Sequence, residues 1–302
     1  MARFGKVLTA MVTPFTNSGE LDLNEAGRLA QWLIENGNDG LVIAGTTGES
    51  PTLTHDEQIA LIEAVVESTD APVVAGTGSN DTKAAIELTQ RAQSVGASGI
   101  LSVTPYYNRP SQQGLLKHFT RIAENTDLPV MLYDIPVRSG RKIETATILE
   151  LVHGVENIVA LKDAAGDPAE TAYLLSKSPD GLEVYSGDDS LNLALLSIGA
   201  VGVVGVATHW SGLEHQNLIQ AVLEGDYSKA KEINQQLQPS FAFESSPEAP
   251  NPIPTKVMMN ILGFNVGKGR PPMDTVPDYL EEVARDLVSS MAVGASIDSS
   301  KK

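Results

Sequence analysis

This 302-residue sequence contains a lysine, Lys162, that ends a strongly apolar segment and could do chemistry. Lys162 follows Ile158–Leu161, a run of the kind that forms a buried strand. An amine drawn out of water can lose its proton more readily, and the neutral amine is the nucleophile that condenses with a carbonyl group. The alternative is a lysine that reaches from a strand end to solvent, and Lys162 alone does not decide between the two.

A second candidate is Gly45–Ser50, which reads Gly-Thr-Thr-Gly-Glu-Ser and follows another apolar run. Two glycines around two hydroxyl groups favour a tight turn whose backbone N–H groups and side chains can converge on a carboxylate or a phosphate. The alternative is an ordinary loop followed by a helix cap. The segment is not a nucleotide-binding loop, because no Gly-Lys-Ser/Thr sequence follows it.

Two further apolar runs end in segments with tyrosines and an arginine. Thr104–Pro110 contains Tyr106 and Tyr107, and Tyr133–Gly140 contains Arg138. Tyrosine hydroxyl groups can relay protons, and a planar guanidinium group can bind a carboxylate through two hydrogen bonds. Isolated tyrosines at strand ends more often pack with an exposed hydroxyl group. Side chains suited to chemistry follow four of the predicted strands, the second, fourth, fifth and sixth, and packing alone is a poor explanation for all four.

Other residue types carry weaker signals. Asp188 and Asp189 follow a further apolar run, and their position favours a helix N-cap. The five histidines show no spacing typical of metal ligands, so no metal site is expected. No Gly-x-Ser-x-Gly segment predicts a serine nucleophile.

The candidates lie at the ends of short apolar runs that recur along the chain. The eight runs are Val7–Val12, Leu41–Ala44, Val73–Ala75, Ile100–Val103, Val130–Tyr133, Ile158–Leu161, Glu183–Tyr185 and Val201–Val206. Near-continuous apolar runs are typical of parallel strands covered by helices on both faces. Eight such units fit a closed (β/α)8 TIM barrel better than an open doubly wound sheet, and the loops after its strands would carry the chemistry.

Amphipathic segments, with apolar residues three and four apart, lie between most of these runs. The clearest are Asn24–Asn36, His55–Ser68, Thr82–Val95, Gln112–Asn125 and Thr145–His153. Leu191–Ala207 has no charged residue, but it is shorter than the roughly 20 residues that cross a bilayer. Its glycines favour a helix followed by a strand.

The chain continues after the eighth run with three helical patterns, Tyr227–Leu237, Thr255–Leu262 and Asp278–Met291. Between the first two, Glu244–Pro254 contains four prolines, which exclude a regular helix interior. We predict a catalytic barrel over residues 1–226 and a small helical domain over residues 227–302. Its last residues, Gly294–Lys302, are expected to fray.

The composition excludes several classes of function. The formal net charge of −17 would repel nucleic acids and anionic membranes, so neither is an expected partner. An anionic substrate must therefore meet a local cluster of positive groups. The absence of cysteine excludes disulfides and thiolate chemistry. Pro14 interrupts the first apolar stretch, and no cleavage pattern follows, so we expect a cytoplasmic protein without a signal peptide.

Seven segments, in their order and spacing, resemble the dihydrodipicolinate synthases, a family of pyruvate-dependent, Schiff-base-forming aldolases. They are Ala10–Phe15, Gly45–Ser50, Val103–Pro110, Tyr133–Arg138, Leu161–Asp163, Tyr185–Asp189 and Asn251–Pro254. The resemblance implies a lyase that condenses pyruvate with L-aspartate 4-semialdehyde to 4-hydroxy-tetrahydrodipicolinate, in the biosynthesis of lysine and diaminopimelate. It implies no cofactor and no metal.

The resemblance also implies roles for single residues. Lys162 would form the imine with pyruvate. Tyr133, Thr46 and Tyr107 would relay protons, with Tyr107 reaching into the site of a neighbouring subunit. Family members are commonly homotetramers built as dimers of dimers, which is what the resemblance implies for this chain.

Four further residues would bind the substrates. Thr47 would hold the pyruvate carboxylate, and Gly187 and Val204 would line the pocket through backbone groups. Arg138 would bind the carboxylate of the semialdehyde. The related N-acetylneuraminate lyases have an apolar residue at that position.

Some relatives are inhibited by lysine at a dimer interface. The corresponding positions here are Ser50, His55, Asn80 and Tyr106. The sequence departs from that pattern at Pro51, Gln58 and Ala84, and Ala84 replaces a glutamate that would pair with the ammonium group of lysine. We therefore predict weak or absent inhibition by lysine.

Two alternative functions are open. One is another aldolase of the same superfamily, acting on N-acetylneuraminate or 2-keto-3-deoxygluconate, and Arg138 together with the tyrosine pair argues against it. The other is a non-catalytic barrel that binds a keto acid. Such a protein would be expected to lack some catalytic groups, whereas the lysine, the threonine and both relay tyrosines are present.

Overall fold

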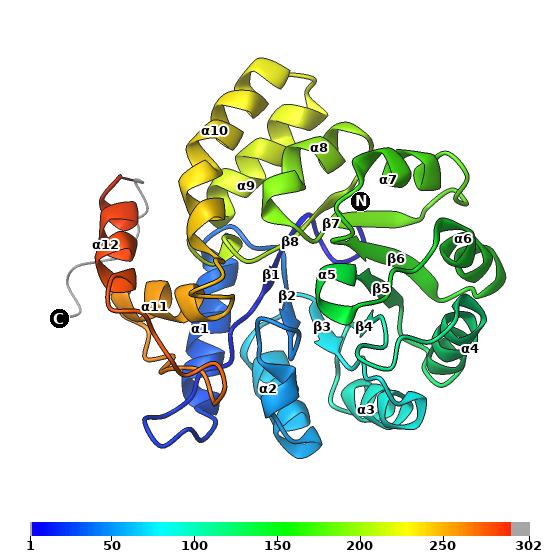
Figure 1. The fold of residues 1–302 in the computed structure, drawn as a ribbon, viewed down its shortest axis with the longest axis horizontal. Coiled ribbons are helices and arrows are strands. Elements are labelled where there is room, and N and C mark those ends of the chain that lie inside the picture. The colour runs from blue at the N-terminus through cyan, green and yellow to red at the C-terminus, as the bar shows by residue number, and fades with distance from the viewer. Residues whose placement is uncertain (1, 291–302) are drawn as a thin grey trace.

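A computed structural model describes residues 2–290, and its eight strands close into a barrel (Figure 1). The strands are β1 (Val7–Ala10), β2 (Gly40–Ile43), β3 (Val73–Gly76), β4 (Gly99–Val103), β5 (Val130–Asp134), β6 (Ile158–Asp163), β7 (Glu183–Ser186) and β8 (Gly202–Gly205). Each pairs in parallel with its neighbour, and β8 pairs with β1 to close the ring. The predicted (β/α)8 barrel is confirmed.

Helices surround the barrel in Figure 1. They are α1 (Leu23–Glu35), α2 (His55–Ser68), α3 (Thr82–Ser94), α4 (Gln112–Ala123), α5 (Pro136–Ser139), α6 (Thr145–Gly154), α7 (Pro168–Leu175), α8 (Asn192–Ser197) and α9 (Thr208–Leu223). The five predicted amphipathic segments match α1 to α4 and α6 closely. Helices α5, α7 and α9 were not predicted. Helix α9 hides its periodicity because it is kinked at Ser211 and buried on several sides.

The segment Leu191–Ala207 folds as predicted, with a helical stretch that ends in α8 followed by β8. Within residues 2–290, no helix combines the length and the apolar character that a bilayer crossing requires.

Three helices follow the barrel and pack on one side of it, beside α1 and α9 (Figure 1): α10 (Tyr227–Phe243), α11 (Ile253–Ile261) and α12 (Leu280–Ser290). The predicted end of the first at Leu237 was wrong, because α10 continues through Pro239. Packing offsets the backbone hydrogen bond that proline removes. Beyond the proline, the Ser240 hydroxyl accepts a hydrogen bond from Trp210 at 2.9 Å, and Phe243 packs edge-on against the same ring.

Two parts of the C-terminal prediction fall beyond residue 290. Met291, the expected last residue of the third helical pattern, and the segment Gly294–Lys302 lie outside the described residues. The division into domains at residue 226 stays a prediction.

The core has two layers, which explains where a site can lie. A large cluster fills the space between the strands and the helices, and a smaller cluster fills the barrel interior. The interior cluster includes Phe4, Leu8, Met131 and Tyr185. Because side chains fill the barrel, a ligand must bind at its rim.

Candidate active site

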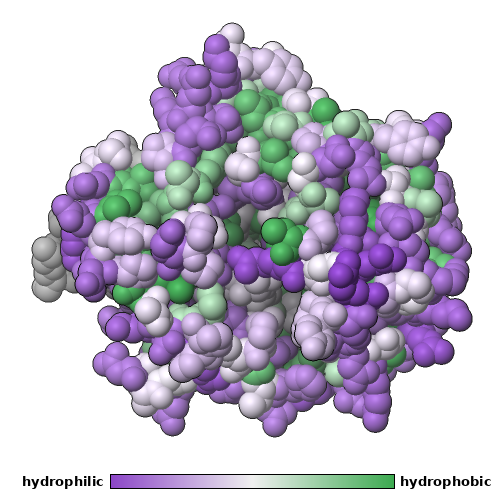
Figure 2. Space-filling model, in the orientation of Figure 1, coloured by the Kyte–Doolittle hydropathy of each residue, from purple (hydrophilic) through white to green (hydrophobic). Residues whose placement is uncertain are grey.

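The face of the molecule that Figures 1 and 2 share is hollowed over the centre of the barrel. Hydrophilic residues border this hollow in the space-filling view. The short helix α5, which follows β5, lies in front of the strands there (Figure 1). This face therefore carries loops that follow the strands, where the sequence predicts the chemistry.

Lys162 and Tyr133 lie side by side at this end of the barrel. The register of β5 and β6 pairs the two residues directly. Side chains alternate along a strand, so Lys162 shares the barrel interior with Ala160, and Tyr133 shares it with Met131. The Lys162 amine lies 4.4 Å from the centroid of the Tyr133 ring.

Both of these residues are almost fully buried, with 5% of Lys162 and 4% of Tyr133 exposed. Within residues 2–290, the Lys162 amine forms no ion pair and no hydrogen bond. A buried amine with an aromatic ring beside it and no carboxylate partner is suited to act as a nucleophile. The apolar run before Lys162 predicts such a buried position for its amine.

Gly187 leaves the space that the Lys162 side chain occupies. Its backbone N–H donates to the Asp163 carbonyl at 2.7 Å, which holds the β7 end against β6. A Cβ atom on Gly187 would lie 2.8 Å from Cγ and 2.9 Å from Cε of Lys162. Glycine is therefore needed here for close approach. Val204 belongs to the interior cluster that ends at the same rim.

Thr46 and Thr47 follow β2 in a tight turn, in which the Glu49 N–H donates to the Thr46 carbonyl at 3.0 Å. Thr46 is half-buried, and its hydroxyl group has no hydrogen-bond partner among the described residues. Thr47 is 3% exposed, and its hydroxyl oxygen accepts a hydrogen bond from Asn251 at 2.9 Å. Both threonines therefore keep a hydroxyl hydrogen that no described residue accepts.

Tyr107 and Arg138 are not gathered around Lys162 in the single chain. Tyr107 is 91% exposed and has a left-handed backbone with φ of 72°. Arg138 lies on α5 with an exposed side chain, and it forms no ion pair within residues 2–290. The structure thus brings together Lys162, Tyr133 and Gly187, while these two side chains extend outward.

The positions that resemble a lysine-inhibition site are half-buried or exposed. Asn80 donates to the Tyr106 carbonyl at 3.2 Å. Ser50 begins the short 3-10 helix η1 (Ser50–Thr52), and its carbonyl accepts a hydrogen bond from the buried Gln58 at 3.1 Å. His55 is exposed at the start of α2. The side-chain amide of Gln58, which departs from the family pattern, is therefore already hydrogen-bonded to a backbone carbonyl group.

The N-cap prediction is confirmed for Asp188 and wrong for Asp189. Asp188 caps the 3-10 helix η2 (Asp189–Leu191) by accepting a hydrogen bond from the Ser190 N–H at 3.0 Å. Asp189 is buried and instead accepts hydrogen bonds from the Val206 and Ala207 N–H groups at 2.7 and 2.8 Å. It therefore fixes the loop that follows β8.

Glu244, which follows the last residue of α10, is half-buried, and its carboxyl group lies beside the buried Asp189. Burial raises the pKa of Glu244 well above its usual value, and the negative charge of Asp189 raises it further. Both effects favour the protonated form of the Glu244 carboxyl group.

A second buried lysine was missed by the sequence analysis. Lys256, on α11, is 2% exposed, and its amine lies 2.8 Å from the carboxylate of Glu49 in the turn after β2. It also donates to the Lys268 carbonyl at 3.0 Å. Its position inside an amphipathic helix pattern gave no signal, because the partner lies more than 200 residues earlier in the chain.

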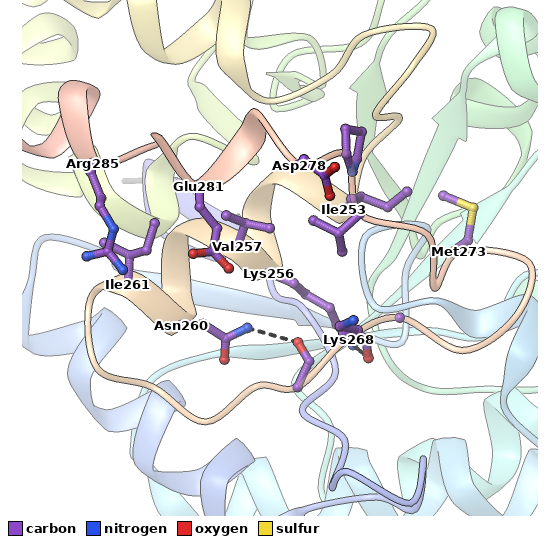
Figure 3. Close-up of a pocket in the computed structure, with 14 residues that line it drawn as sticks. Ile253, Lys256, Val257, Asn260, Ile261, Lys268, Met273, Asp278, Glu281 and Arg285 are labelled. Atoms are coloured by element: carbon purple, nitrogen blue, oxygen red, sulfur yellow. Dashed lines mark hydrogen bonds between the residues drawn. The ribbon is translucent and has the colours of Figure 1, made fainter. Parts of the chain in front are cut away.

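Lys256 lines a cavity of about 380 Å³ between α11, α12 and the loop that joins them (Figure 3). Asn260, Lys268, Glu281 and Arg285 are among its other lining residues. None of the predicted site residues lines this cavity. It is therefore separate from the predicted site residues, although Lys256 links it to the turn after β2.

A closed parallel barrel, with a buried lysine that has a tyrosine beside it and no ion-pair partner in the described part of the chain, defines a barrel enzyme suited to carbonyl chemistry. Residues 3–290 match the Dihydrodipicolinate synthetase family. The chain belongs to this family.

Individual relatives agree with this assignment. The 4-hydroxy-tetrahydrodipicolinate synthase of Acidothermus cellulolyticus is 50% identical over 297 residues, which are 97% of this chain and 94% of that protein. Dihydrodipicolinate synthase DapA-2 of Bacillus anthracis is 43% identical, with a TM-score of 0.92 over 96% of this chain and 99% of that one. The chloride-inhibited dihydrodipicolinate synthase of Acinetobacter baumannii, complexed with pyruvate, is 32% identical, with a TM-score of 0.90 over 96% and 99%.

Proposed function

We propose that this chain condenses pyruvate with L-aspartate 4-semialdehyde to give 4-hydroxy-tetrahydrodipicolinate, in the biosynthesis of lysine and diaminopimelate. It is a carbon–oxygen lyase, as are the 4-hydroxy-tetrahydrodipicolinate synthases that it resembles over nearly its whole length. The observation that carries the proposal is the buried amine of Lys162, 4.4 Å from the ring of Tyr133.

The first half of the reaction joins pyruvate to Lys162. The neutral amine attacks the C2 carbonyl carbon of pyruvate and forms a carbinolamine. The carbinolamine loses its hydroxyl group as water, and an imine remains. Tyr133 donates the proton that the departing hydroxyl group needs, and Thr46 and Tyr107 return a proton to Tyr133. The short distance between Lys162 and Tyr133 supports this role.

The second half builds the new carbon–carbon bond. The imine acidifies the methyl group of pyruvate, which loses a proton and becomes an enamine. The enamine carbon attacks the aldehyde carbon of the semialdehyde, and the resulting alkoxide takes up a proton. The amino group of that substrate then attacks C2, closes the ring and displaces the Lys162 amine.

Positive and polar groups at the rim bind the two anionic substrates. The Thr47 hydroxyl binds the carboxylate of pyruvate, and Arg138 binds the carboxylate of the semialdehyde through its planar guanidinium group. Gly187 and Val204 line the pocket. Arg138 is free of ion pairs within residues 2–290, which supports a role in binding because its charge is not already satisfied.

Assembly completes the site in this proposal. Tyr107 is 91% exposed in the single chain, which is unusual for a catalytic tyrosine and supports its donation to a neighbouring subunit. The enzyme then works as a homotetramer, a dimer of dimers, in the cytoplasm. Mixed dimers of Tyr107→Phe and Lys162→Ala chains test this arrangement. They regain activity only if the tyrosine acts in the neighbouring site, and no recovery would refute the donation.

Inhibition by lysine is expected to be weak or absent, because Ala84 removes a carboxylate partner for the inhibitor. An initial-rate assay with added L-lysine tests this expectation. Half-inhibition at a submillimolar concentration would reject it.

The reaction itself is tested by reducing the protein with borohydride in the presence of pyruvate. The expected result is a stable adduct on the peptide that contains Lys162, together with consumption of aspartate semialdehyde in a coupled assay. An adduct on a different residue would overturn the assignment of Lys162. An adduct on Lys162 with turnover of N-acetylneuraminate instead would favour the related lyases.

A further inference from the structure

Asn251 lies at the start of the Asn-Pro-Ile-Pro segment and contacts the turn that follows β2. Its side-chain amide donates to the Thr47 hydroxyl oxygen at 2.9 Å, across a separation of 204 residues. Asn251 and Thr47 are both buried. This contact joins the segment before α11 to the turn that the proposed function assigns to the pyruvate carboxylate.

The direction of the Asn251 amide is fixed from its other side. The hydroxyl group of Thr255, which is fully buried in the first turn of α11, donates to the Asn251 side-chain oxygen at 3.1 Å. The oxygen of the amide is therefore satisfied by Thr255, and the nitrogen faces Thr47. The hydrogen bonds therefore run in one direction, from the Thr255 hydroxyl group through the Asn251 amide to the Thr47 hydroxyl oxygen.

This orientation decides what the Thr47 hydroxyl can do. A hydroxyl group has one hydrogen to donate and can accept at its oxygen. Because the oxygen of Thr47 accepts from Asn251, its hydrogen must point elsewhere, and no described residue accepts it. Accepting one hydrogen bond also polarises a hydroxyl group and strengthens the one that it donates.

We propose that Asn251 is a positioning residue for the first substrate, which turns the Thr47 hydroxyl into a dedicated hydrogen-bond donor for the pyruvate carboxylate. The proposal rests on the proposed function, since it needs pyruvate bound at Thr47. Asn251 acts through Thr47 and does not touch the substrate. Thr255 sets the direction of the chain.

Asn251→Asp is the sharpest variant, because it keeps the shape of the side chain and reverses the hydrogen bond. A carboxylate at this position can only accept, so the Thr47 hydroxyl would donate to it and could no longer donate to pyruvate. We expect the KM for pyruvate to rise about 10- to 100-fold, the range for losing a hydrogen bond to a charged group. The KM for aspartate semialdehyde is expected to stay within about twofold.

Asn251→Ala removes the partner without reversing the bond, so Thr47 can still rotate to donate. The expected rise in the KM for pyruvate is smaller, about 3- to 10-fold. Asn260→Asp is the matched control, because it adds the same charge to an exposed position of α11. It should leave the KM for pyruvate unchanged.

A double-mutant cycle separates positioning from general damage to the fold. In a Thr47→Val background the hydroxyl group is gone, so adding Asn251→Asp should raise the KM for pyruvate no further. The pyruvate concentration that half-saturates borohydride trapping on Lys162 gives the same comparison without the second substrate. Chains that fail to fold lower the maximal amount of trapping and leave this half-saturating concentration unchanged.

The outcomes distinguish the two proposals. If the unaltered protein forms no adduct at Lys162, the proposed function fails. If it forms the adduct and Asn251→Asp acts no more strongly than Asn251→Ala, the inference alone is overturned. Equal effects of Asn251→Asp with and without the Thr47 hydroxyl overturn it as well.

Discussion

Lys162 and Lys256 are buried to a similar degree, with 5% and 2% of each residue exposed, yet their surroundings differ. Lys256 lies 2.8 Å from Glu49 and also donates to a backbone carbonyl. Lys162 has an aromatic ring beside it and no carboxylate partner among residues 2–290. The comparison teaches that burial alone does not distinguish the two lysines. The absence of a carboxylate partner does, and the proposed function assigns the reaction to the lysine without one.

Replacing Lys162 with alanine is expected to have the largest effect. Turnover should fall by at least about 1000-fold, because the proposed imine with pyruvate can no longer form at Lys162. Stability should change little, since no partner is left uncompensated. Coupled rate measurements and thermal unfolding of the same preparation check both expectations. A Lys162→Ala variant that keeps full turnover would show that Lys162 is not the reactive lysine.

Replacing Lys256 with methionine is expected to act on stability instead. The change leaves the buried Glu49 with a hydrogen bond from the Arg270 N–H but without its ion pair to Lys256, which should cost roughly 3–5 kcal/mol in the free energy of unfolding. Urea denaturation measures this loss, and borohydride trapping per folded molecule should be retained. The double variant with Glu49→Gln should recover part of the stability. If it recovers none, the ion pair is not the cause.

The pH dependence of stability offers a third way to test the comparison. Burial lowers the pKa of Lys256 from 10.5 to about 8, although Glu49 opposes the change. The folded protein therefore binds fewer protons than the unfolded chain between these two values. Stability rises with pH across this window, and the gain is lost again as the pH falls to 8.

The full change is worth roughly 3 kcal/mol, from about 1.4 kcal/mol for each pKa unit. Unfolding of the native chain and of Lys256→Met, each measured at pH 7.5 and about pH 10.5, isolates this contribution from other titrating groups. The native chain should gain stability relative to the variant. Parallel curves would show that Lys256 is not perturbed by its burial.

Gly187→Ala is expected to have the smallest effect of the four. The new methyl group would lie 2.8 Å from Cγ of Lys162 and should displace the amine, which can cost about 10- to 100-fold in kcat/KM. Gly154→Ala is the matched control, because nothing lies within 4 Å of its added methyl group. Equal activity of both variants would show that the Lys162 side chain has more freedom than its packing suggests.

The strands were predictable because each is a short apolar run buried on both faces, a pattern that depends only on neighbouring residues. The side-by-side position of Tyr133 and Lys162 also follows from sequence, since consecutive strands of a barrel are neighbours. The course of α10 was not predictable, because contacts of Ser240 and Phe243 with α9 override the local effect of Pro239.

The remaining contacts of the site depend on residues that are distant in the sequence. Gly187 has no local pattern that shows its close approach to Lys162. The hydrogen bond from Asn251 to Thr47 joins residues 204 positions apart, so no periodicity or spacing reveals it. The segment around Asn251 stood out for its prolines and as part of a family resemblance, and neither gave Asn251 a role.

The two contacts of Asn251 and Lys256 with the turn after β2 matter for anyone who recombines this chain with its relatives. A chimera that takes the barrel from one parent and the C-terminal helices from another inherits the two halves of each contact separately. Crossovers anywhere between residues 50 and 250 carry this risk, however well each half folds. Parents should therefore be matched first at Thr47 with Asn251, and at Glu49 with Lys256.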